Sequence, residues 1–78
     1  MEIIEDKKII LFLKRRNLVL QYLKCKKLLR KNFLKMVDFK IRKPKSNNIY
    51  SFRINKKFRA LGIFEQGDFR VFRIDDHQ

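Results

Sequence analysis

The chain has 78 residues, is 45% hydrophobic and contains only 2 Gly and 1 Pro, which predicts one globular domain over residues 1–78 and argues against disorder. Its longest apolar run, Ile9 to Leu13, is far shorter than the roughly 20 residues that span a bilayer, so we expect no membrane segment. The formal net charge of +13 is larger than solubility requires and points to a polyanionic partner.

Two helices are predicted in the first half of the chain. Asp6 can cap a first helix that ends near Arg16, with Asn17 as the break. In the second helix, apolar side chains recur every three or four residues and form one stripe, which indicates core packing. The stripe comprises Leu18, Tyr22, Cys25, Leu29, Phe33 and Met36. Its end stays open, since Asn32 could stop the helix and leave Phe33 onward as a packed loop.

The period then changes to that of strands. Residues 37 to 42 alternate between apolar and charged side chains and can be extended, and Pro44 begins a loop. Gln66 and Gly67 form a two-residue hairpin connection in which Gly67 can take a positive φ. The three strands expected after the loop are Ile49 to Ile54, Phe58 to Phe64 and Asp68 to Ile74.

Side-chain alternation assigns faces to the first of these strands but not to the last. Tyr50, Phe52 and Ile54 form an apolar face that should meet the helices, whereas the opposite face carries Arg53. The expected fold class is therefore α+β, with two N-terminal helices packed on one face of a three- to four-stranded antiparallel sheet whose other face is open and basic. An initial strand is at best the stub Glu2 to Ile4.

The basic residues are unevenly distributed along the chain. Of the 21 Lys and Arg residues, 19 lie between Lys7 and Arg59, where the only acidic residue is Asp38. Such a stretch repels itself unless a polyanion or an acidic partner screens it, and nucleic acid is the first candidate. The one cysteine, Cys25, can form no internal disulfide, which fits a reducing cytoplasm.

No metal or cofactor is expected from the residues present. The sequence has one His and one Cys, and the neighbouring carboxylates of Asp75 and Asp76 point to opposite faces of a strand, so they cannot complete a coordination set. There is also no Gly-rich phosphate loop.

Three groups stand out as candidates for chemistry: Arg53, Arg59 and His77. Antiparallel pairing should bring Arg53 beside Arg59, and the end of the last strand should bring His77 within side-chain reach of Arg59. Guanidiniums around a proton carrier suit RNA cleavage through the 2′-hydroxyl, which needs a base, an acid and positive charge at the phosphorane. The plainer interpretation is that His77 is a chain-terminal residue without a role.

The segment IYSFRINKKFRALGIFEQGDFRVFRIDDHQ, from Ile49 to Gln78, resembles the sheet half of the RelE/ParE toxin superfamily. In that family an aromatic-Arg pair opens the central strand, and a hairpin leads to a terminal strand ending near a His or basic residue. The upstream helices and KIRKPK, Lys40 to Lys45, match the family's order. The resemblance implies a toxin of a type II toxin-antitoxin system. RelE-type members cut messenger RNA in the ribosomal decoding site, and an acidic antitoxin silences them.

The resemblance also implies roles for individual residues, according to their positions in the matching segment. Arg59 of KFRA is similar to the central-strand arginine that contacts the scissile phosphate, Arg53 to a basic residue on the preceding strand, and His77 to a terminal histidine that carries a proton. Ser51 stands where RelE has a second lysine, and no tyrosine follows His77, which implies a variant site or lost cleavage. The residues expected to hold RNA phosphates are Lys40, Arg42, Lys43, Lys45, Lys56 and Lys57.

The leading hypothesis is thus a ribosome-dependent mRNA endonuclease with an acidic antitoxin as partner. A ParE-like, non-enzymatic inhibitor of DNA gyrase is an alternative that needs no His77. A second alternative is a basic RNA- or DNA-binding module without catalysis, in which Tyr50 and Phe58 could stack on bases if they were exposed.

Overall fold

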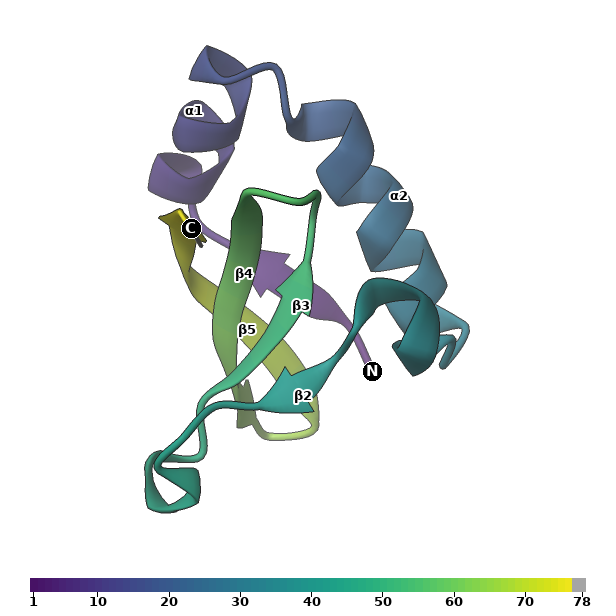
Figure 1. Ribbon diagram of the computed structural model, residues 1–78, viewed down its shortest axis with the longest axis vertical. Coiled ribbons are helices and arrows are strands. Elements are labelled where there is room, and N and C mark those ends of the chain that lie inside the picture. The colour runs from purple at the N-terminus through teal and green to yellow at the C-terminus, as the bar shows by residue number, and fades with distance from the viewer. Residues whose placement is uncertain (77–78) are drawn as a thin grey trace.

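A computed structural model describes residues 1–76 of the chain. Two helices cover one side of a five-stranded sheet with the spatial order β1-β5-β4-β3-β2 (Figure 1). The helices are α1 (Lys7–Arg15) and α2 (Val19–Arg30), and the strands are β1 (Ile3–Glu5), β2 (Lys40–Ile41), β3 (Tyr50–Arg53), β4 (Phe58–Glu65) and β5 (Asp68–Asp76). Two short 3-10 helices, η1 (Leu34–Val37) and η2 (Lys45–Asn47), flank β2. The expected α+β class is confirmed.

The expectation of a purely antiparallel sheet with three or four strands is wrong. The stub at the N-terminus is a strand, β1, which pairs in parallel with β5 in the register Ile3 to Phe69 and Glu5 to Val71. The side chain of Ile3 is buried, which gives this short strand its hold on the core. Three residues with no pattern of their own carry too little signal to predict such long-range pairing.

The helices begin and end where local chemistry allows. Asp6 caps α1 by accepting a hydrogen bond from the backbone N of Ile9 at 3.1 Å, as predicted. Asn17 and Asn32 both adopt a positive φ, 56° and 63°, so the early end of α2 is the correct alternative. Phe33 and Met36 are 48% and 67% exposed and do not continue the buried stripe.

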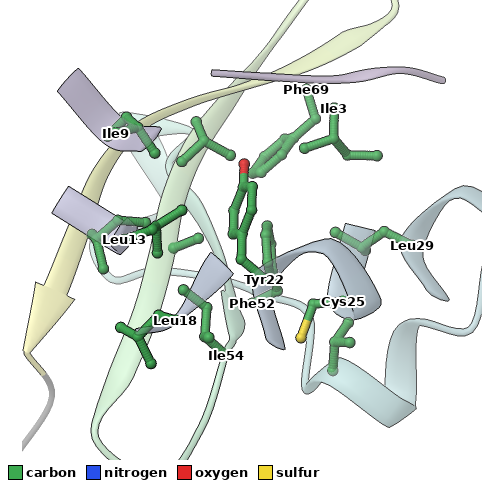
Figure 2. Packing of buried hydrophobic residues seen from close by; sticks show 14 residues of the cluster. Ile3, Ile9, Leu13, Leu18, Tyr22, Cys25, Leu29, Phe52, Ile54 and Phe69 are labelled. Atoms are coloured by element: carbon green, nitrogen blue, oxygen red, sulfur yellow. The ribbon is translucent and has the colours of Figure 1, made fainter. Parts of the chain in front are cut away.

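The core lies between the helices and the sheet (Figure 2). Tyr22 of α2 stacks on Phe52 of β3 with ring centroids 6.0 Å apart, and both side chains are fully buried. The Tyr22 hydroxyl donates to the carboxylate of Glu5 at 2.5 Å, and Lys26 Nζ lies 3.0 Å from the same carboxylate. These two contacts to Glu5 hold β1 against α2.

Two local features shape the β4–β5 hairpin. Gln66 and Gly67 both adopt a positive φ, 52° and 87°, which confirms the predicted two-residue turn. Between Leu61 and Gly62 the register shifts, because Phe72 has no partner opposite it on β4. Before the bulge the buried residues of β5 are Phe69 and Val71, whereas after it the buried residue is Ile74, so the alternation shifts by one position. This shift is why the faces of β5 could not be assigned from the sequence.

Candidate nucleic-acid interface

The sheet has one face toward the helices and one away from them. In the paired register, Phe52 lies beside Ala60 and Ala60 beside Ile74, and all three belong to the core under the helices. Since side chains alternate along a strand, the intervening residues face the other way. The residues of this outer face are Ser51, Arg53, Arg59, Leu61, Arg73 and Asp75.

The predicted neighbourhood of the two arginines is confirmed. Arg53 on β3 is paired directly with Arg59 on β4, which is in turn paired with Asp75 on β5. The two guanidiniums have different surroundings, however. Arg53 is exposed, whereas Arg59 is only 5% exposed and is buried beneath the surface of the outer face.

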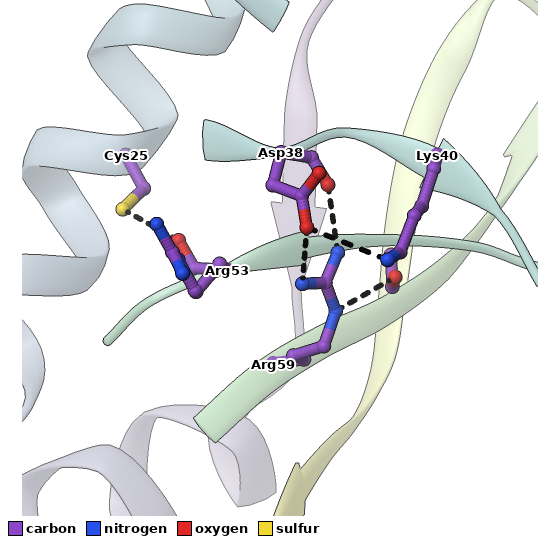
Figure 3. Close-up of polar contacts among 6 residues, drawn as sticks. Cys25, Asp38, Lys40, Arg53 and Arg59 are labelled. Carbon is purple, nitrogen blue, oxygen red and sulfur yellow. Dashed lines mark hydrogen bonds and ion pairs between the residues drawn. The ribbon is translucent and has the colours of Figure 1, made fainter. Parts of the chain in front are cut away.

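Arg59 is held by three hydrogen bonds (Figure 3). Its Nε donates to Ser51 Oγ at 3.0 Å, one terminal nitrogen donates to the carboxylate of Asp38 at 2.9 Å, and the other donates to the backbone carbonyl of Asp38 at 2.7 Å. These contacts fasten β4 to the corner between η1 and β2, where Asp38 adopts a left-handed backbone with φ 49°. The buried guanidinium is therefore already paired within the protein.

The pairing also determines the ionisation of Asp38. The hydrogen bond from Arg59 lowers the pKa of the Asp38 carboxyl below its usual value, and the nearby Lys40 ammonium lowers it further. Lys40 Nζ lies 3.5 Å from the same carboxylate. Asp38 thus stays ionised at neutral pH and offsets part of the positive charge of the outer face.

A hollow of about 300 Å³ opens on this face beside the Arg59 cluster. Ser51 and Arg59 are its buried residues, and Lys40, Arg42 and Lys43 bring three further cationic side chains to its wall. A concave site lined by cations and a hydroxyl suits a phosphate group, because each of these groups can donate hydrogen bonds to anionic oxygens. Three of the six residues expected to hold RNA phosphates, Lys40, Arg42 and Lys43, therefore lie together at this hollow.

Two arginines from different parts of the sheet meet at Asp75. A terminal nitrogen of Arg42, which follows β2, lies 3.4 Å from Asp75 Oδ2, although β3 and β4 stand between these strands in the sheet. A terminal nitrogen of Arg73 lies 3.8 Å from Asp75 Oδ1. The reach of Arg42 to β5 means that the outer face is concave.

The remaining predicted RNA-binding residues lie elsewhere. Lys45 is exposed in η2, within the loop that joins β2 to β3. Lys56 and Lys57 lie in the turn between β3 and β4, at the other end of β3, where Lys57 Nζ is 3.8 Å from Asp76. The structure does not bring these two lysines to the hollow. The predicted proton carrier, His77, lies outside the described residues.

Sequence reasoning did not assign a site role to Asp38, Arg73 or Asp75. The signal for Asp38 was its isolation as the one acidic residue among 19 basic residues. Arg73 and Asp75 could not be placed, because the bulge at Phe72 hides the parity of β5.

Within residues 1–76, no group of three His, Cys, Asp or Glu side chains is arranged to hold a metal ion. In the same part of the chain, no helix combines the length and apolar character needed to cross a bilayer. Comparison with family models, curated proteins and solved structures finds no match to this chain.

Proposed function

We propose that the protein is the toxin of a type II toxin-antitoxin system and acts as a metal-independent, ribosome-dependent mRNA endonuclease in the cytoplasm. The observation that carries this proposal is the concave cationic hollow lined by Lys40, Arg42, Lys43, Ser51 and Arg59. The likeness of the C-terminal half to RelE-type toxins supports the same function. An acidic antitoxin is the proposed partner, since it would neutralise the net charge of +13.

The residues divide the chemistry among them. Lys40 and Arg42 at the wall of the hollow bind non-bridging phosphate oxygens and stabilise the charge that develops on the phosphorane. Arg53 does not line the hollow and lies in a separate pocket with Cys25 and Lys24 of α2, so it has no direct part in this step. Arg59 acts mainly as a positioning residue, because its hydrogen bonds already go to Ser51 and Asp38. The imidazole of His77 is proposed to carry the proton that the 2′-hydroxyl loses or the 5′-oxygen gains.

The test is brief induced expression followed by mapping of transcript ends by primer extension. Wild-type protein should arrest growth and produce breaks within translated codons. The double variant Lys40→Ala/Arg42→Ala, and separately His77→Ala, should relieve both effects. The matched control is Lys7→Ala/Lys8→Ala, which removes the same charge from the exposed side of α1 and should remain toxic. Harmless wild-type expression, or growth arrest without breaks in transcripts, would rule out this function, and breaks that persist in all variants would rule out the assigned residues.

One observation favours a binding function without catalysis as a second candidate. The guanidinium of Arg59, which the family resemblance places at the scissile phosphate, is buried and paired with Asp38. A non-enzymatic toxin that targets gyrase would not need it at a reacting phosphate. Base stacking is less favoured, since Tyr50 packs on Phe39 and Phe58 packs on Phe12. Growth arrest with DNA damage and intact transcripts would select the gyrase alternative.

A further inference from the structure

The carboxylate of Asp75 lies between two guanidiniums on the outer face, and one of them, that of Arg42, belongs to the lining of the hollow. Its Oδ2 is 3.4 Å from Arg42 and its Oδ1 is 3.8 Å from Arg73. Both distances exceed the 2.7 to 2.9 Å or so that is typical of a strong charge-assisted hydrogen bond. The contrast is with Asp38, which Arg59 holds at 2.9 Å. Asp75 is therefore attracted to both arginines but tightly bound by neither.

A phosphodiester can take the place of the carboxylate at this position. It presents two anionic oxygens that a guanidinium can bind in parallel, and two guanidiniums on opposite sides can share one phosphate. The arginine side chains are 38% and 67% exposed, for Arg42 and Arg73 respectively, so both can meet a ligand that arrives from solvent. Their ion pairs with Asp75 are solvent-screened and easily broken.

We propose that Asp75 is an internal competitor for substrate: it stands where a backbone phosphate of single-stranded RNA binds between Arg42 and Arg73, and bound RNA displaces it. The inference rests on the proposed function for the identity of the ligand, whereas the phosphate site itself rests on the geometry. In the unbound protein Asp75 pairs with Arg42 and so lowers the affinity of this arginine for weakly bound polyanions.

The neighbouring Asp76 supplies a matched control. Its side chain lies on the opposite side of β5, where its ion pair is with Lys57 at 3.8 Å. Asp75→Asn and Asp76→Asn therefore change the net charge equally, although the first removes two long ion pairs and the second removes one. Only the first removes a carboxylate that pairs with Arg42 of the hollow.

The experiment measures binding of a labelled single-stranded RNA oligonucleotide to the full-length chain by fluorescence anisotropy over a range of salt concentrations. Asp75→Asn should tighten binding about two- to fivefold more than Asp76→Asn does, the range that an exposed ion pair spans. In an Arg42→Gln background this difference in RNA affinity should disappear, because Asp75 then has no Arg42 guanidinium to pair with. Arg73→Gln should weaken binding. Circular dichroism shows whether each variant is folded.

A parallel series with inorganic phosphate separates this inference from the proposed function. Phosphate should raise the melting temperature of Asp75→Asn more than that of Asp76→Asn. If RNA binds no variant but the phosphate difference persists, free single-stranded RNA is not the ligand and the phosphate site stands, whereas the proposed function is decided separately by cleavage on ribosomes. Equal effects of the two substitutions on both ligands would overturn the inference.

Discussion

Arg59 has a different role in the structure from the one its position in the sequence suggested. A basic residue on a central strand of a cationic face is expected to meet substrate, yet its three hydrogen bonds to Ser51 and Asp38 lie within the protein. Removing the guanidinium would take one hydrogen-bond donor from each of three groups: the Ser51 hydroxyl, the Asp38 carboxylate and the Asp38 backbone carbonyl. The residue therefore bears on stability as well as on function.

Arg59→Gln should lower the free energy of unfolding by about 1–3 kcal/mol, because it leaves partly buried polar groups unpaired. The exposed neighbour Arg53 is the control, and Arg53→Gln should cost about 0.5 kcal/mol or less. Urea unfolding of both variants measures the difference. Equal stabilities would show that the Arg59 cluster does not hold the β2 corner.

The lowered pKa of Asp38 predicts that the free energy of unfolding depends on pH in the acid range. Because its pKa is lower in the folded chain than its ordinary value of 3.8, its ionised form stabilises the fold above that value, and the contribution is lost as pH falls through the folded pKa. Asp38→Asn should therefore lose less stability than the wild type between about pH 5 and pH 2. Urea unfolding across that range is the measurement, and parallel curves for the two proteins would contradict it.

At the scale of elements, the sequence predicted what depends on local pattern. The cap at Asp6, the turn at Gly67 and the burial of Phe52 follow from short-range rules and are all observed. Two features escaped because distant residues determine them. The strand β1 exists through pairing with β5, and the residues before β2 turn through a left-handed Asp38 that Arg59 holds.

The candidate site was predictable in part for the same reason. The pairing of Arg53 with Arg59 follows from a short hairpin, and the grouping of Lys40 with Arg42 follows from strand alternation. The partners that neutralise these cations come from other strands, as Asp75 does. Such contacts depend on the curvature of the sheet, which alternation alone does not encode.

The attachment of β1 to α2 gives a prediction at alkaline pH. Burial raises the pKa of the Tyr22 hydroxyl well above its ordinary value of 10.0, and its hydrogen bond to Glu5 raises it further. The stabilisation is fully present below the unfolded pKa and is lost as pH rises above it, since the unfolded chain ionises first.

Tyr22→Phe should therefore flatten the alkaline loss of stability and lower stability at neutral pH by about 1–2 kcal/mol, because Glu5 loses a donor. Tyr50→Phe, on a half-buried ring, is the control. Urea unfolding between about pH 7 and pH 11 compares the variants. An alkaline decline that persists unchanged in Tyr22→Phe would contradict the account.

At the scale of the whole molecule, charge dominates. The 19 basic residues from Lys7 to Arg59 are carried by both layers, so the helices and the outer face of the sheet are positive together. Within residues 1–76, six ion pairs involve these basic residues and offset only part of this repulsion. Added salt or a bound polyanion, which screens the repulsion among these positive charges, should therefore stabilise the fold.

The melting temperature should rise between about 0.05 and 0.5 M NaCl, because salt screens the repulsion among exposed charges over this range. A short RNA oligonucleotide should give a comparable rise at far lower concentration, since it binds as a polyanion. Differential scanning fluorimetry measures both. A melting temperature that falls steadily with salt would show that the ion pairs outweigh the repulsion.

The most direct measurement uses purified protein, ribosomes programmed with an end-labelled messenger RNA, and a gel that resolves the products. We expect cleavage at defined codon positions that requires the ribosome and needs no added metal beyond what the ribosome holds. Cleavage should be lost in Lys40→Ala/Arg42→Ala but kept in Lys7→Ala/Lys8→Ala. Intact messenger RNA with the wild-type protein, at concentrations that saturate binding, would contradict this expectation.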